Sequence, residues 1–101
     1  MSLYRLEYHP RTESELRRLP LRLRRRIDWQ LEFLRAAPFR SHPGVRVKAT
    51  RKVHGVWHFH ASKEVRVFYT THGEVVWVVK IDRSKGVMRC VLPPDVGPEG
   101  R

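Results

Sequence analysis

Apolar and polar side chains alternate from Leu3 to His9, where tyrosine and leucine take one side and arginine and glutamate take the other. Alternation with a period of two is the pattern of a half-buried strand. Pro10 follows, and proline suits the first turn of a helix because no N–H donor is needed there. Pro20 ends this helix after Leu19. The first part of the chain therefore predicts a strand and then a short helix.

A second helix is predicted from Leu21 to Ala37, because apolar residues recur there at helical spacing and Pro38 ends the pattern. Its apolar stripe is formed by Leu23, Ile27, Leu31 and Leu34. Trp29 and Phe33 lie four residues apart and widen this stripe, so we expect both side chains to lie in the core. Two helices joined by a tight turn at a proline form an αα-hairpin.

From residue 53 onward the spacing of apolar residues becomes that of strands. Three strands are predicted, at Val56–Ala61, Val65–Thr71 and Val75–Ile81. His72-Gly73 marks a hairpin turn between the last two. Short connections make the three strands an antiparallel meander. Because the two helices would cover one face of this sheet, the predicted fold class is α+β.

A loop is predicted over Phe39–Lys52, and it is basic, with room for a short extended piece. The length of 101 residues fits one domain, which we place at residues 1–91. Residues 92–101 are rich in proline and glycine, and we expect them to form a disordered tail.

The period of two also predicts which strand residues face the helices. The expected core residues are Trp57, Phe59, Val65, Val67, Trp77 and Val79. The open face of the sheet then carries His58, His60 and Arg66. Lys80 joins them in one of two registers of the last hairpin, because a shift of one residue turns a side chain to the opposite face.

The charge is strongly one-sided, with 21 Lys and Arg against 10 Asp and Glu and a formal net charge of +11. A field of this sign attracts polyanions, nucleic acid first and anionic membrane surfaces second. The sequence shows no apolar stretch of membrane-spanning length and no secretory pattern at its N-terminus, so we expect a cytoplasmic protein with no membrane partner.

Cysteine and histidine usage argues against a metal centre. Cys90 is the single cysteine, which excludes an intrachain disulfide and a cysteine-based zinc site. His58 and His60 form a His-x-His pair, but two ligands do not make a site and no third stands out. We therefore predict neither a metal nor another cofactor.

Five segments together resemble the RelE/ParE toxin superfamily over residues 3–89. They are Tyr4-Arg-Leu-Glu-Tyr-His-Pro10, Leu16-Arg-Arg-Leu-Pro20, Gly55-Val-Trp-His-Phe-His60, Val65-Arg-Val-Phe-Tyr69 and Val75-Val-Trp-Val-Val-Lys-Ile-Asp-Arg83. Each motif alone is weak, and the resemblance rests on their order and spacing. It implies a RelE-like fold, with the N-terminal strand, the helical hairpin and the meander in that order.

The resemblance also implies a function and a set of site residues. In the ribosome-dependent RNases of that superfamily, basic residues on the open sheet face cut mRNA in the ribosomal A site. The family's pair of lysines falls on His58 and His60, its arginine on the next strand falls on Arg66, and its arginine after the last strand falls on Arg83. The implied partners are mRNA, the ribosome and an acidic antitoxin. The further basic residues expected to bind RNA are Arg46, Lys48, Arg51, Lys52 and Lys80.

The chemistry of these residues suits RNA cleavage by the RNA's own 2′-hydroxyl, which needs a base, an acid and cations that stabilise phosphoryl charge. An imidazole titrates near neutral pH, so His58 or His60 is suited to act as base or acid. Arg66 and Arg83 are suited to hold phosphate oxygens bidentately. The plainer alternative, that both histidines are solvated strand residues, stays open.

One departure from the family pattern keeps a second function open. The family often carries a tyrosine or histidine a few residues after the last strand. This sequence has Val87 and Met88 in that region, and no tyrosine or histidine follows His72. The alternative is a toxin-fold protein without RNase activity, either a ParE-like gyrase inhibitor or a degenerate nucleic-acid-binding domain.

Overall fold

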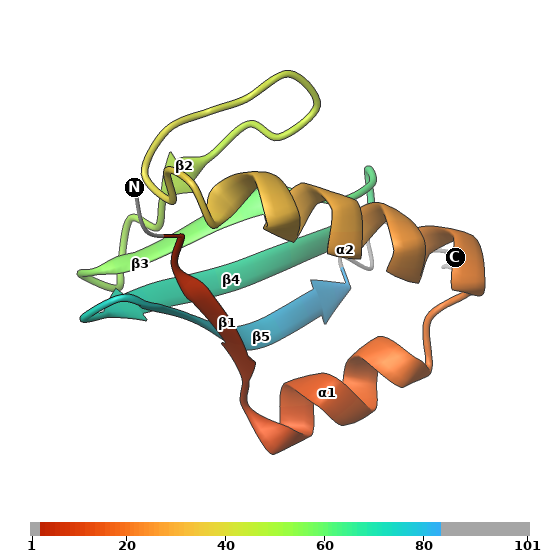
Figure 1. Ribbon diagram of the computed structural model, residues 1–101. Helices are drawn as coiled ribbons and strands as arrows, with labels where there is room; N and C mark the ends of the chain where they lie inside the picture. Colours follow the sequence, from red (N-terminus) through yellow and green to blue (C-terminus); the bar gives the residue numbers. More distant parts are fainter. Residues whose placement is uncertain (1–2, 84–101) are drawn as a thin grey trace.

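The computed structural model describes residues 3–83 (Figure 1). In chain order the elements are β1 (Arg5–Tyr8), α1 (Pro10–Arg17), α2 (Leu21–Leu34), β2 (Lys48–Ala49), β3 (Val56–His60), β4 (Val65–His72) and β5 (Val75–Arg83). This order confirms the α+β class and every predicted element, with differences of one to three residues at most ends. The tail expected at residues 92–101 lies outside the described residues.

The strands form one mixed sheet in the order β1-β5-β4-β3-β2. The three long strands pair antiparallel through short turns, as the meander prediction requires. Strand β2 is the short extended piece of the basic loop, and it pairs antiparallel with β3 at one edge. Strand β1 pairs parallel with the first part of β5, which brings the N-terminal strand beside the last one.

Local hydrogen bonds mark the start of α1 and the end of α2. The Nδ1 atom of His9 accepts a hydrogen bond from the backbone of Arg11 at 3.2 Å, which caps α1. Helix α2 ends at Leu34, three residues before the predicted end. The next residue, Arg35, binds Tyr4, which precedes β1: its backbone oxygen accepts from the Tyr4 N–H at 2.9 Å and its Nε atom donates to the Tyr4 carbonyl at 2.7 Å.

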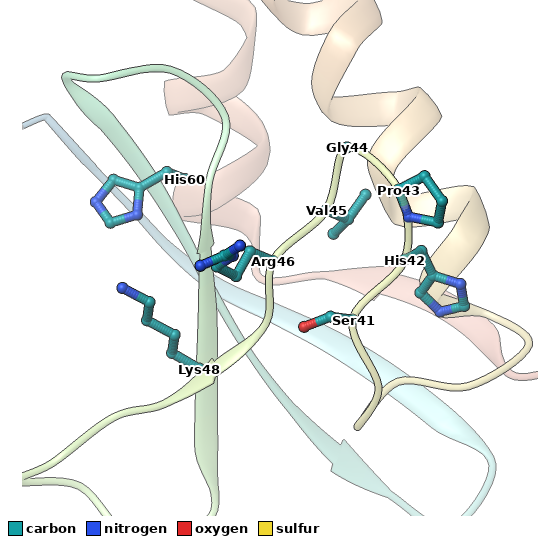
Figure 2. Close-up of a pocket in the computed structure, with 8 residues that line it drawn as sticks. All are labelled: Ser41, His42, Pro43, Gly44, Val45, Arg46, Lys48 and His60. Atoms are coloured by element: carbon teal, nitrogen blue, oxygen red, sulfur yellow. The ribbon is translucent and has the colours of Figure 1, made fainter.

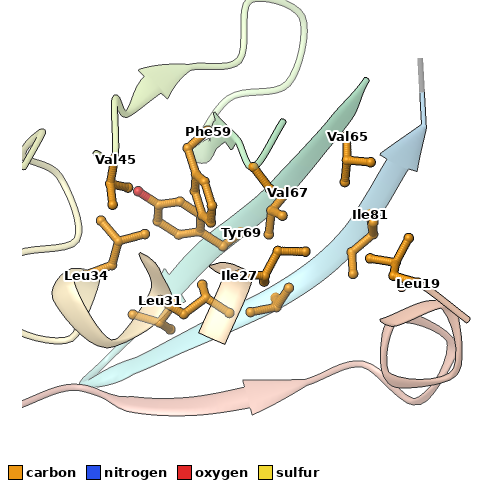
Figure 3. Close-up of a cluster of buried hydrophobic side chains, with 13 residues drawn as sticks. Leu19, Ile27, Leu31, Leu34, Val45, Phe59, Val65, Val67, Tyr69 and Ile81 are labelled. Atoms are coloured by element: carbon orange, nitrogen blue, oxygen red, sulfur yellow. The ribbon is translucent and has the colours of Figure 1, made fainter. Parts of the chain in front are cut away.

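The core lies between α2 and the sheet (Figure 3). Helix α2 runs across one face of the sheet, and α1 lies beside β5 (Figure 1). The fully buried apolar side chains of α2 and the sheet are Ile27, Leu31, Leu34, Phe59, Val67, Tyr69, Val76 and Val78. The hydroxyl of the buried Tyr69 donates to the Pro38 carbonyl, so this tyrosine packs in the core with its polar atom satisfied. Trp57 is half-buried and packs against the same cluster.

The prediction that Trp77 and Val79 are buried is wrong. Their exposed fractions are 37% and 38%, and Val76 and Val78 take the core positions. The pairing of β4 with β5 is irregular at this point, because Tyr69 pairs with Val78 whereas Phe68 pairs with Lys80. Val79 is therefore an extra residue in β5, and such a bulge breaks the period of two on which the prediction relied.

The expectation that Trp29 and Phe33 lie in the core is also wrong. Trp29 is 50% exposed and Phe33 is 38% exposed. The Trp29 ring packs over Gly44 of the basic loop and edge-on against Phe33, with ring centroids 4.7 Å apart. Gln30, the residue after Trp29, is fully buried instead. Its side-chain amide can be buried because it donates a hydrogen bond to the Gly44 carbonyl at 2.9 Å.

Candidate nucleic-acid-binding site

Strand pairing sets the candidate residues in two adjacent rows on the open face of the sheet. One row runs across four strands through Lys48, His58, Phe68 and Lys80. The next row runs across three strands through His60, Arg66 and Asp82. Directly paired residues point to the same side of a sheet, so the structure brings three of the predicted catalytic residues together: His58, His60 and Arg66.

His58 lies at the centre of this face. Its ring centroid is 6.1 Å from that of His60 and 5.2 Å from that of Phe68. Its Nδ1 atom forms a hydrogen bond of 3.1 Å with the hydroxyl of Thr50, the residue after β2. This contact holds the ring's orientation with either tautomer, because a threonine hydroxyl can both donate and accept. Nε2 is then the ring nitrogen left for a ligand.

The surroundings of His58 disfavour its charged form. Partial burial lowers the pKa of its imidazole below the ordinary value of 6.5, and the positive charges of His60, Arg66 and Lys48 lower it further. His58 is therefore neutral at neutral pH, and a neutral imidazole can accept a proton.

Arg66 has an acidic partner that the sequence analysis did not identify. Its guanidinium donates to the carboxylate of Asp82 at 2.6 Å, and its charged group lies 5.3 Å from the centre of the Phe68 ring. The Nε atom of Arg66 is buried and has no hydrogen-bond partner among the described residues. A phosphate bound at Arg66 would therefore share this arginine with Asp82.

Two hollows flank Lys48, which lines both. The site hollow, of about 500 Å³, is lined by His58, Arg66, Phe68 and residues 48–52, which include Arg51 and Lys52. The loop hollow, of about 450 Å³, is lined by residues 41–46, Lys48 and His60. Figure 2 shows the side chains of Arg46 and Lys48 pointing toward His60. Four of the five residues expected to bind RNA thus line one of these two hollows.

The structure does not bring Arg83 to the histidines. Arg83 pairs with Val65, whose side chain is buried, so the register places Arg83 on the helix side of the sheet. Together with Lys80 and residues of α1 and its C-terminal end, Arg83 lines a separate hollow of about 300 Å³. Lys80 pairs with Phe68 and therefore stands in the first row, at the opposite end from Lys48.

Two further observations concern cofactors and membranes. Among residues 3–83, histidine, cysteine and acidic side chains form no cluster of three or more that is arranged to hold a metal ion. Neither α1 nor α2 is long and apolar enough to cross a membrane.

No family model and no curated protein sequence matches this chain. Solved structures do match it, and toxins and toxin–antitoxin complexes are among them. The archaeal RelE–RelB complex from Pyrococcus horikoshii OT3 matches with a TM-score of 0.67 and 19% identity, covering 80% of this chain and 94% of the matched chain. The free E. coli RelE toxin, as a double mutant, matches with a TM-score of 0.68 and 18% identity, covering 83% and 86%.

A third match is the YoeB/ParE toxin from Agrobacterium tumefaciens, with a TM-score of 0.65 and 15% identity, covering 78% of this chain and 96% of that one. At such identities the likeness is one of fold. It confirms the RelE-like fold that the order of the five sequence motifs predicts.

Proposed function

We propose that this chain, whose fold is that of the RelE and YoeB toxins, is the toxin of a type II toxin–antitoxin pair and that it cleaves mRNA on the ribosome. One observation carries the proposal. Two histidines stand side by side on the open sheet face, next to Arg66, with Lys48 and the basic loop around them. This is a surface that combines proton transfer with phosphate binding.

The proposed reaction begins at the 2′-hydroxyl of the RNA. Neutral His58 takes the hydroxyl proton, and the 2′-oxygen attacks the adjacent phosphorus. The bond from phosphorus to the 5′-oxygen breaks, and His60 donates a proton to that leaving oxygen. Arg66 and Lys48 stabilise the charge on the phosphoryl oxygens. The products are a 2′,3′-cyclic phosphate and a free 5′-hydroxyl.

The proposed protein partner is an acidic antitoxin. Several structural neighbours are complexes of a toxin with a RelB or DinJ antitoxin. A net charge of +11 favours an acidic partner, because opposite charges speed association and select against basic competitors. Such a partner would silence the toxin by covering the open face or the helical hairpin.

The test of the proposal is cleavage of an mRNA on ribosomes paused with a known codon in the A site. The purified chain is added, and the cut position is mapped by primer extension. We expect a cut within the A-site codon, and none in the same mRNA without ribosomes. Intact mRNA in both samples would contradict the ribosome-dependent activity.

A second function is favoured by one observation, the placement of the arginines. Arg66 is paired with Asp82, and Arg83 lies on the helix side of the sheet, so neither is free on the open face. A toxin-fold protein that binds gyrase or nucleic acid without cutting RNA would need neither arginine there. Inhibition of gyrase supercoiling by the purified chain, together with intact mRNA on ribosomes, would support this alternative.

A further inference from the structure

The loop hollow has a wall that is held in place by a buried polar residue. Gln30 of α2 is fully buried, and its side-chain amide donates to the Gly44 carbonyl at 2.9 Å and to the His60 carbonyl at 3.5 Å. The next loop residue, Val45, is 1% exposed and belongs to the core. Gln30 therefore ties the loop to α2, and it ties α2 to β3 at the edge of the same hollow.

The backbone of the loop is also fixed by its own contacts. His42 and Val45 exchange backbone hydrogen bonds of 2.9 and 2.8 Å, and the hydroxyl of Ser41 accepts from the backbone of Val47 at 3.0 Å. Gly44 has a φ of +87°, and a Cβ atom there would lie 3.0 Å from the ring of Trp29. A ligand in this hollow would thus meet a preformed wall, which lowers the entropy lost on binding.

The side chains that line the loop hollow are cationic or neutral. Arg46, Lys48 and His60 line it together with Ser41, and none of its lining residues is acidic. The site hollow differs, because Arg66 there is already paired with a carboxylate. An anion in the loop hollow would therefore meet two permanent positive charges with no competing acid, which is an arrangement suited to phosphate.

The two hollows are neighbours. Lys48 lines both, and the two histidines of β3 are divided between them, with His58 at the site hollow and His60 at the loop hollow. Their rings are 6.1 Å apart between centroids. A polyanion with regularly spaced charges that enters one hollow would extend naturally into the other.

We propose that the loop hollow is a second phosphate subsite, which takes the phosphate and ribose adjoining the scissile phosphate of single-stranded RNA. This inference rests on the proposal that the chain binds RNA, and it assigns Arg46 to binding of the substrate. Each phosphate that the protein neutralises adds to affinity and to its dependence on salt. The scissile phosphate would occupy the site hollow beside His58.

The test compares two ligands that cannot be cut because they lack a 2′-hydroxyl: a thymidine dinucleotide with one phosphate and a thymidine trinucleotide with two. Affinities are measured by NMR titration of the full chain. In the wild type we expect the second phosphate to tighten binding about tenfold or more, as a charge-assisted contact does. The amide signals of Gly44 and Val45 should shift when the trinucleotide binds the wild type, because one of its two phosphates then lies in the loop hollow.

The matched variants are Arg46→Ala and Arg25→Ala. Both arginines are exposed, and Arg25 lies on α2 away from either hollow. We expect Arg46→Ala to reduce the gain from the second phosphate to less than about threefold, and Arg25→Ala to keep the wild-type gain. An equal gain in Arg46→Ala and the wild type would overturn the subsite, and so would an equal loss in both variants. Because neither ligand can be cleaved, this outcome is independent of whether the chain cuts mRNA.

Discussion

His58 differs from an ordinary surface histidine because cations and an aromatic ring surround it. Burial, and then the charges of His60, Arg66 and Lys48, lower its pKa. We predict that His60→Gln raises the pKa of His58 toward 6.5, since one nearby cation is removed. The measurement is an NMR titration of the imidazole protons, with His72→Gln as the control in the β4–β5 hairpin. A wild-type His58 that titrates at or above 6.5 would contradict this picture.

The lowered pKa of His58 also sets the sign of its effect on stability. The folded state binds this proton less tightly than the unfolded state, where the pKa is about 6.5. The unfolded state therefore binds more protons in the window between the folded pKa and 6.5, so stability rises with pH there and falls on acidification.

Asp82 partly neutralises the charge of Arg66 on the open face of the sheet. The two side chains are 38% and 32% exposed and lie 2.6 Å apart. We predict that Asp82→Asn strengthens the binding of single-stranded RNA. A plot of the logarithm of the binding constant against the logarithm of the salt concentration should become steeper by roughly 0.7, the slope expected for one more neutralised phosphate. Glu74→Gln is the matched control, because it removes one negative charge at the β4–β5 turn. Weaker binding in Asp82→Asn would show instead that Asp82 is needed to position Arg66.

The residues of the candidate site divide into those a local pattern can find and those it cannot. His58, His60 and Arg66 share a face by strand alternation alone, and the structure confirms that placement. Thr50 and Asp82 reach the site only through pairing between strands, so a reading of single segments misses them. Once the position of the bulge is known, Lys80 lies on the open face. Asp82, two residues later on the same strand, must then lie on that face as well.

At the scale of elements, the sequence predicts helices and strands well because most have a clear period. Proline or glycine also marks several of their ends, at Pro10, Pro20, Pro38 and Gly73. The exception is β5, where Val79 is an extra residue and the side chains before and after it follow different alternations. Nothing in the local sequence marks this bulge, since four valines and a tryptophan fit either face. The local sequence does not show either that Trp29 lies outside the core, because the position of its ring depends on contact with Gly44 in the loop that follows α2.

The contact of α2 with the sheet should carry most of the stability of the fold. Leu31 is fully buried, whereas Leu21 at the start of the same helix is 52% exposed. We predict that Leu31→Ala lowers the free energy of unfolding by about 2–5 kcal/mol, because it removes apolar contacts and leaves a cavity. Leu21→Ala should change it by less than about 0.5 kcal/mol. Circular dichroism melts test this, and equal losses in both variants would contradict the assignment of the core.

At the scale of the whole molecule, a net charge of +11 combines with a basic open face and a basic loop. We predict that the chain, expressed with its neighbouring reading frames, copurifies with a small acidic protein that folds on binding. Mixing the two should also protect the amides of the covered surface from hydrogen exchange. Recovery of the free chain alone, or with a basic partner, would count against the antitoxin proposal.

The most direct test of the account is the activity of a His58→Ala, His60→Ala double variant in the ribosome cleavage assay, with a melting curve run in parallel. Neither side chain belongs to the core, so the melting temperature should stay close to that of the wild type. Cleavage should fall by about 10²–10⁴-fold or more, because a general base and a general acid are both lost. A folded double variant that cleaves mRNA as fast as the wild type would show that the histidines take no part in the reaction.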